Sequence, residues 1–333
     1  MRRSGGELPV SLAEIVPKMI LLLAVALVPI FFGLLLGYFA GISGTIDNVH
    51  VRSLVSFVMS FSLPCALFLA IVKAPRDLLL GQGRVIAVLA TVYLAAYGAA
   101  YFFSQMAGRK SSADGAVLAL SLAFPNVTAV GIPLLETVYG PQTAITVAIA
   151  IAVGAMTISP ITLSILENST AAGHALTGWT RARRAILRAV RRPVVWAPAA
   201  GVAAVLLNVS LPVYVTRSLM VMGSATAGCA LFLTGLIVSA QKFTLDWRVL
   251  AGVAAKNILQ PLVCLGLAHA ASLPIDQTRS VVLMAAIPCG FFGLVFGKGF
   301  NASPLLASSS LILSYGLGIL TLAGWIVLLG RLH

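Results

Sequence analysis

Apolar residues dominate ten successive runs along the chain, and charged residues or Gly, Pro and Asn breaks separate each run from the next. A helix needs about 20 consecutive apolar residues to cross the hydrocarbon layer of a membrane, and the runs are close to that length. No soluble domain fits between them. We therefore predict ten transmembrane helices, at residues 19–41, 52–73, 85–107, 116–139, 143–166, 194–210, 213–240, 249–272, 280–300 and 303–330.

The overall composition supports a membrane protein. Hydrophobic residues make up 59% of the 333 residues and charged residues only 9%, whereas a soluble domain carries about 25% charged residues. The expected fold class is therefore an all-α polytopic membrane protein. The first run, 19–41, is too long for the core of a signal peptide, so we expect it to remain as the first spanning helix.

Basic residues outnumber acidic ones and give a net charge of +13. They are spread over short loops and lack a basic face with stacking aromatics, so we expect membrane lipid and no nucleic acid as a partner. Lys and Arg accumulate in cytoplasmic loops, so the most basic segment, between residues 167 and 193, predicts a cytoplasmic linker. Its arginines are Arg181, Arg183, Arg184, Arg188, Arg191 and Arg192.

A repeated motif divides the chain into two halves. Residues 65–69 read Cys-Ala-Leu-Phe-Leu, and the same five residues recur at 229–233, which is 164 positions later. Five helices are an odd number, so the second copy enters the membrane from the opposite side, and the repeats are inverted. The basic linker is expected on the cytoplasmic side, so we expect both termini outside the cell. The predicted organisation is a first five-helix repeat at 1–166, a basic cytoplasmic linker at 167–193 and a second five-helix repeat at 194–333.

The fourth and ninth predicted helices contain proline and glycine near their centres. Proline removes a backbone donor, and the freed carbonyls must face protein or a cavity because lipid cannot bond them. A single such helix is usually a packing kink, but interrupted helices at equivalent repeat positions indicate a transport site. The unpaired N–H groups that begin each second half-helix favour an anion. The predicted hinge and crossover residues are Pro125, Gly131, Pro133, Pro288 and Gly293.

The acidic residues all lie at or near predicted helix ends, and none is clearly at the membrane midplane. A sodium/proton antiporter or a cation channel needs intramembrane carboxylates, so these functions are disfavoured. The histidines lie near loops or ends, and the four cysteines lack metal-ligand spacing. We expect no metal, no cofactor and no enzymatic activity, because the midplane offers no general base or nucleophile.

Lys256 is the one charge well inside a predicted span. An unpaired lysine at the midplane would cost about 2.5–3.5 kcal/mol on insertion scales. Two interpretations remain open. Either the side chain snorkels towards a nearby aqueous end, or it attracts an anion or pairs with a neighbour.

The motif of the fourth helix resembles the auxin efflux carrier family. Pro125 and Asn126 are followed by Gly-Ile-Pro-Leu-Leu at 131–135 and by Tyr-Gly at 139–140, and Pro64 also fits. The second half agrees at Pro288, Gly290, Val295, Phe296, Lys298, Asn301 and Pro304, and in the spacing of Lys256 and Pro261. The family includes plant PIN-formed auxin transporters and bacterial carriers of malonate, malate and related acids.

The resemblance implies a scaffold part, a moving transport part and crossed fourth and ninth helices that hold a carboxylate. Asn126 is then the leading ligand, with the backbone after Pro288 opposite it. Plant members of the family have a sequence similar to Asn-Pro-Asn at the position where this chain has Arg192-Pro193-Val194. They also tend to carry an acidic residue at the position of Ser224. The chain is therefore more similar to a bacterial carrier. The candidate substrate-binding residues are Leu63, Pro125, Asn126, Val127, Thr128, Lys256, Pro288, Cys289 and Gly290.

The expected function is secondary transport of a small organic anion, a mono- or dicarboxylate of the malonate or malate type, by alternating access. Two alternatives remain open: a sodium-coupled symporter of the bile-acid type and a membrane sensor that does not transport. A homodimer is a candidate assembly.

Overall fold

The structure, a computed structural model, describes residues 12–46, 51–73, 76–77, 81–106, 111–169, 180, 183, 187, 191, 193–298, 300, 302 and 304–332. Within these residues the fold is helical throughout and contains no strand, and the only β-type pairing is a single bridge between Pro125 and Cys289. The predicted all-α fold is thus confirmed. Most of the basic linker, including Arg181, Arg184, Arg188 and Arg192, lies outside the described residues.

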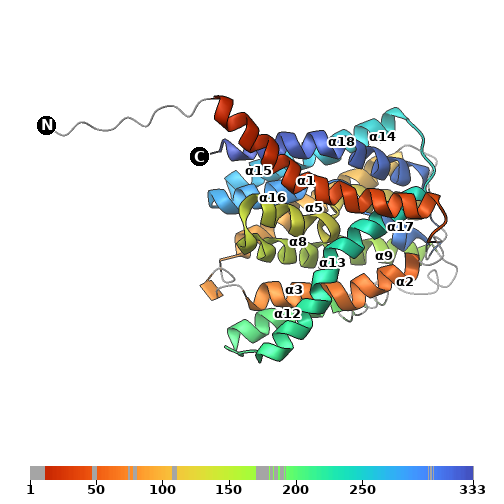
Figure 1. The fold of residues 1–333 in the computed structure, drawn as a ribbon. Helices are drawn as coiled ribbons and strands as arrows, with labels where there is room; N and C mark the ends of the chain where they lie inside the picture. Colours follow the sequence, from red (N-terminus) through yellow and green to blue (C-terminus); the bar gives the residue numbers. More distant parts are fainter. Residues whose placement is uncertain are drawn as a thin grey trace.

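The helices follow one another closely along the chain (Figure 1). Three five-residue stretches, η2, η3 and η5, have π-helical geometry, and η4 is a 3₁₀ turn. The elements are α1 Leu12–Ile42, α2 Val51–Phe57, η2 Val58–Ser62, α3 Leu63–Val72, α5 Gly83–Met106, α6 Ser112–Ala123, η3 Val127–Gly131, α7 Ile132–Tyr139, η4 Pro141–Thr143, α8 Ala144–Met156, α9 Ile158–Asn168, α12 Pro193–Leu206, α13 Val213–Ser239, α14 Trp247–Ala254, η5 Ala255–Leu259, α15 Gln260–Ala270, α16 Ile275–Ala286, α17 Phe292–Lys298 and α18 Leu305–Gly330.

Seven helical segments in the described part of the chain are long and apolar enough to cross a membrane. Shorter apolar helices cover Ser112–Ala123, Val127–Tyr139 and Trp196–Leu206. The seven long segments are Ile20–Ile42, Val51–Val72, Gly83–Met106, Pro141–Asn168, Val213–Ser239, Trp247–Ala270 and Leu305–Gly330. These segments bear out the prediction of several membrane-spanning helices.

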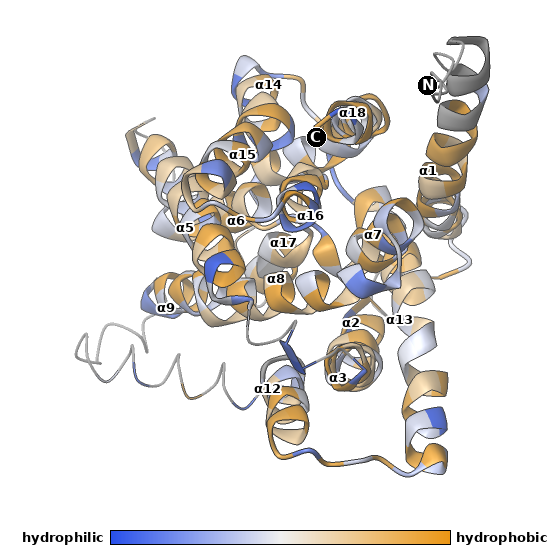
Figure 2. Cartoon of the chain, turned by 90° about the vertical axis from the view of Figure 1, so that its left-hand side faces the viewer, coloured by the Kyte–Doolittle hydropathy of each residue, from blue (hydrophilic) through white to orange (hydrophobic). Residues whose placement is uncertain are grey.

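The helices form two groups (Figure 2). The first helix group contains α1, α2, α3, α12 and α13, and the second contains α5, α6, α8, α9, α14, α15, α16, α17 and α18. Helices α6 and α16 lie at the centre of the second group, and residues 280–287 are buried without exception. A helix that is apolar and buried on all sides is typical of the interior of a large membrane protein.

Close backbone packing joins α1 to α13 in the first helix group. A Cβ added at Gly37 would lie 1.9 Å from the carbonyl oxygen of Phe232, and one added at Gly235 would lie 1.8 Å from that of Leu34. Lipid supplies no hydrophobic force between helices, so small residues that permit close contact stabilise such a pair.

The α1–α13 contact predicts the effect of adding a methyl group. Gly37→Ala should lower the thermal stability of the purified protein by about 1–3 kcal/mol, because α1 must move away from α13. Gly316→Ala is a matched control, because a Cβ there meets nothing within 4 Å. Melting curves in detergent measure both variants, and equal melting temperatures would contradict the proposed packing.

Candidate functional site

Two helices of the second group are interrupted where proline was expected to interrupt them. Helix α6 ends at Ala123, and Phe124 adopts an extended conformation before η3 begins at Val127. Helix α16 ends at Ala286, and α17 begins at Phe292. We call residues 124–126 the first break and residues 287–291 the second break.

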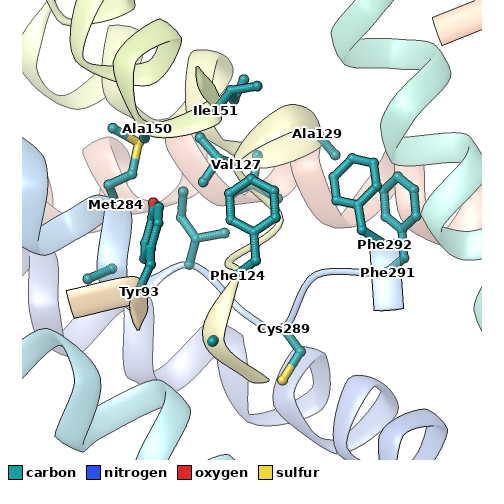
Figure 3. Close-up of a cluster of buried hydrophobic side chains, with 14 of the residues drawn as sticks. Tyr93, Phe124, Val127, Ala129, Ala150, Ile151, Met284, Cys289, Phe291 and Phe292 are labelled. Carbon is teal, nitrogen blue, oxygen red and sulfur yellow. The ribbon is translucent and has the colours of Figure 1, made fainter. Parts of the chain in front are cut away.

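The two breaks contact each other through their backbones. The N–H group of Asn126 donates to the carbonyl oxygen of Pro288 over 3.0 Å. Pro125 and Cys289 form the antiparallel bridge between the two segments. Figure 3 shows Phe124 and Cys289 on the two segments as these pass each other. Each break thus supplies partners for backbone groups that the other leaves open.

Gly290 permits the closest approach within this contact. Its N–H group donates over 3.1 Å to the carbonyl oxygen of Ser121, which lies in the last turn of α6. A Cβ at position 290 would lie 2.3 Å from the carbonyl oxygen of Phe124, so a side chain has no room.

Asn126 is fully buried and connects the first break to both helix groups. Its Nδ2 donates to Thr234 Oγ1 of α13 over 3.0 Å and to the hydroxyl of Tyr315 in α18. The Thr234 hydroxyl itself donates to the carbonyl oxygen of Ala230, so it can only accept from Asn126, which fixes the orientation of the amide. The Oδ1 atom of Asn126 has no hydrogen-bond partner among the described residues.

A cavity of about 310 Å³ adjoins the first break and lies between the two helix groups. Phe124 and Phe292 stack on one side of it, with their ring centroids 5.7 Å apart. Figure 3 shows these aromatic side chains beside the crossing segments. The lining residues are Val55, Ser56, Met59, Ser60, Phe124, Thr128, Ile151, Ala155, Ser159, Pro160, Leu163, Pro193, Phe292, Val295 and Phe296.

Thr128 supplies the polar group of this cavity that lies nearest the first break. It belongs to η3, is 1% exposed, and its hydroxyl has no hydrogen-bond partner among the described residues. A buried hydroxyl without a partner is costly, so Thr128 is a candidate for contact with a ligand. The N-terminal end of the η3–α7 helix also carries a partial positive charge that favours an anion.

The structure brings only some of the predicted binding residues to this cavity. Thr128 lines it, whereas Pro125, Asn126 and Val127 lie behind the lining. Leu63 is fully buried at the start of α3 and does not line the cavity. Residues of α2 and η2, one to two turns earlier, line it instead.

The backbone N–H groups that follow Pro288 in the second break are already hydrogen-bonded within the protein. The N–H group of Cys289 donates to Ser314 Oγ over 3.0 Å, and that of Gly290 is bonded as described above. The expected unpaired N–H groups are therefore not found at these two positions. Pro288, Cys289 and Gly290 form the contact between the breaks, and Phe292 is the first residue after this break to line the cavity.

The remaining predicted hinge residues occupy distinct places. Pro133 is the second residue of α7, which continues directly from the π-helical η3, so it has no N–H group to bond the preceding turn. Gly131 ends η3. Gly293 faces α6, where a Cβ would lie 2.4 Å from the carbonyl oxygen of Val117. Gly293 is therefore a close-packing position.

The side chain of Lys256 is buried and hydrogen-bonded, which excludes one of the two interpretations of this residue. Its side chain is 2% exposed, and its Nζ donates to the carbonyl oxygen of Ala285 over 2.6 Å. Snorkelling towards an aqueous end is therefore wrong, and pairing with a neighbour is what the structure shows. The residue lies in the π-helical stretch η5, buried against the end of α16.

Sequence reasoning missed several polar partners of the site. Thr234 directly follows the repeated motif at 229–233, and Gln260 lies one helical turn after Lys256. Both residues could therefore have been recognised from a feature next to them in the sequence. Tyr315 and Ser314 lie in an apolar helix without any distinguishing pattern.

A second, larger hollow of about 840 Å³ lies between α5 and the α14–α15 helix. Small apolar residues such as Ala95, Ala99 and Ala251 form much of its wall. Lys256 and Gln260, which bond the ends of the two interrupted helices, also line this hollow. No residue of either break lines it, whereas Phe124 of the first break lines the smaller cavity, so the cavity at Thr128 is the better candidate site.

An all-helical membrane protein in which two interrupted helices meet beside a cavity has the architecture of a membrane transporter. Residues 22–326 match the family described as membrane transport protein. The chain belongs to this family, the auxin efflux carrier family, which confirms the resemblance drawn from its motifs. The members are transporters.

Relatives agree with this assignment. The chain is 30% identical over 303 residues to "Uncharacterized transporter YfdV" of Escherichia coli (strain K12), covering 90% of this chain and 95% of that protein. It is 29% identical over 170 residues to "Probable auxin efflux carrier component 5c" of Oryza sativa subsp. japonica, covering 47% and 45%. It is 23% identical over 305 residues to "Putative malonate transporter" of Rhizobium meliloti (strain 1021), covering 90% and 93%.

Contact between the breaks predicts that Gly290→Ala destabilises the protein. The methyl group would overlap the carbonyl oxygen of Phe124 and force the segments apart, at a cost of about 1–3 kcal/mol. Thermal unfolding in detergent measures the loss. Gly266→Ala is the control, since a Cβ there meets nothing within 4 Å; a wild-type melting temperature for Gly290→Ala would contradict the contact.

Proposed function

We propose that the protein is a secondary carrier that moves a small organic anion across the cell membrane by alternating access. The cargo is a mono- or dicarboxylate of the malonate or malate type. The observation that carries this proposal is the unpaired Thr128 hydroxyl in a cavity beside two interrupted helices. The family supports transport, and the relative named as a putative malonate transporter supports this class of cargo.

We further propose ten spans arranged as two inverted repeats. Each interrupted helix, residues 112–139 and 275–298, makes one span in two pieces, and α12 makes a short one. Together with the seven long segments they give ten. Five spans precede the linker and five follow it, so the second repeat enters the membrane from the other side.

Contacts between equivalent repeat positions support this symmetry. Ser62 and Thr226 are 164 residues apart and share a hydrogen bond of 2.6 Å. Pro125 and Cys289, which form the isolated bridge, are also 164 residues apart. This is the offset of the repeated motif, and residues touch their own equivalents only beside a twofold axis. An axis through both pairs accounts for these contacts.

The cavity offers hydroxyl groups and helix ends to the carboxylate instead of a cationic side chain. The described residues that line it include no lysine, arginine or histidine. Ser56 and Ser60 line the cavity from α2 and η2, Ser159 lines it from α9, and Thr128 lines it from η3. Hydroxyl donors and the positive end of η3 can hold an anion without binding it too tightly for release.

Alternating access follows from the position of the cavity between the two helix groups. Movement of the second group against the first would close the cavity on one side and open it on the other. The Asn126–Thr234 hydrogen bond joins the groups and must break during this movement. Pro193, at the end of the basic linker, lines the cavity, so we assign the present opening to the linker side, which is cytoplasmic, with both termini outside.

A thermal-shift screen of mono- and dicarboxylates on the purified protein, followed by uptake of labelled malonate into proteoliposomes, tests the proposal. We expect stabilisation by at least one small carboxylate and uptake of that acid without a requirement for sodium. Binding without uptake would indicate a sensor, and sodium-dependent uptake would indicate a coupled symporter.

The Thr128 hydroxyl predicts a loss of affinity in Thr128→Val, which keeps the shape and removes the donor. The Kd for the carboxylate should rise by about tenfold, because an anion loses one hydrogen bond worth about 1.5 kcal/mol. Thr91→Val serves as the control, because Thr91 is exposed on α5 and bonds its own helix. Isothermal titration measures both, and equal Kd values would remove Thr128 from the site.

Asn126 yields a second prediction. Asn126→Ala should weaken carboxylate binding by about 1–3 kcal/mol, because Thr234 and Tyr315 lose the amide that holds the first break in place behind Thr128. Titration of the folded variant measures the change. An unchanged affinity would show that Asn126 does not contribute to binding.

A further inference from the structure

One helix reaches the ends of both interrupted helices. Lys256 Nζ donates to the carbonyl oxygen of Ala285 over 2.6 Å, and Gln260 Nε2 donates to the carbonyl oxygen of Ala123 over 2.8 Å. The two side chains are 2% and 5% exposed. They lie four residues apart in the α14–η5–α15 helix and therefore on one face of it.

The two acceptors are helix ends. Ala285 lies in the last turn of α16, which ends at Ala286, and Ala123 is the last residue of α6. The last four carbonyl groups of a helix lack partners within that helix and together carry about half a negative charge. Lys256 and Gln260 thus each supply a donor to the C-terminal end of one interrupted helix.

A third residue of the same stretch anchors the donors. Asn257 Nδ2 donates to the carbonyl oxygen of Ser314 over 3.1 Å, and Asn257 Oδ1 accepts from Ser314 Oγ over 2.7 Å. Trp325 Nε1 donates to the backbone oxygen of Asn257. The Ser314 hydroxyl also accepts from the N–H group of Cys289, so this network links η5 directly to the second break.

The charge of Lys256 changes the balance at the crossing. The C-terminal ends of α16 and α6 contribute about −0.5 charge each. Among the described residues classed as buried, Lys256 is the only charged side chain, and no buried carboxylate offsets it. An ammonium group at Lys256 more than offsets the negative end of α16 and leaves positive charge beside the crossing.

We propose that Lys256 and Gln260 are paired positioning residues that cap the C-terminal ends of α16 and α6, and that the charge of Lys256 makes the crossing attractive to an anion. The capping role stands on the hydrogen bonds alone. The role of the charge rests on the proposed function, because it requires an anionic cargo.

Hydrogen exchange on the full chain in nanodiscs tests the capping role without any substrate. Lys256→Met should raise exchange about tenfold in residues 283–290 and leave residues 119–126 unchanged, because only the end of α16 loses its cap. Gln260→Leu should do the reverse. Lys242→Met, an exposed lysine, is the control. Equal changes in both segments, or in neither, would overturn the paired capping role.

Lys256→Gln separates the charge from the cap, because glutamine keeps a donor and removes the positive charge. We expect nearly normal exchange at 283–290 but a KM for the carboxylate raised about tenfold with little change in kcat. Lys256→Arg should keep most of the affinity. A wild-type KM in Lys256→Gln would overturn the role of the charge. If the wild-type protein neither binds nor moves any carboxylate, the proposed function and the charge role fail together, and the exchange measurements still decide the capping role.

Discussion

Backbone polar groups cannot be left open to lipid, and this constraint shapes the protein around its two interrupted helices. Each break frees carbonyl groups that a continuous helix would have bonded. Two sets of hydrogen bonds satisfy these groups. The breaks bond each other through Asn126 and Pro288, and polar side chains of the α14–η5–α15 helix bond the C-terminal ends of α6 and α16. Helices α6 and α16 are therefore enclosed by protein, while the long outer helices expose large hydrophobic side chains.

The same constraint explains why binding and movement can share one place. An interrupted helix exposes polar groups only where a cavity or a partner receives them, so the cavity at Thr128 lies beside the first break and between the two helix groups. Asn126 contacts Thr234 of one group and Tyr315 of the other. A ligand that competes for these polar groups would thereby alter how the groups hold each other.

Much of the fold could be predicted from sequence because hydrophobicity and proline act locally. The apolar runs and the breaks at Pro125 and Pro288 depend on residues within a single helix. The direction of the Lys256 side chain could not be predicted, since it depends on the end of α16, which lies 29 residues further along the chain. The place of the cavity could not be predicted either, because residues of α2, η2, α8 and α9, which lie far apart in the sequence, line it together.

The central claim is that a carboxylate binds in the cavity lined by Thr128, next to the point where the two breaks meet. Anomalous diffraction from crystals grown with bromomalonate would locate the ligand most directly. We expect a bromine peak inside this cavity, with carboxylate density within hydrogen-bonding distance of Thr128 Oγ1. A bromine peak confined to the hollow between α5 and α14–α15, with the Thr128 cavity empty, would contradict it.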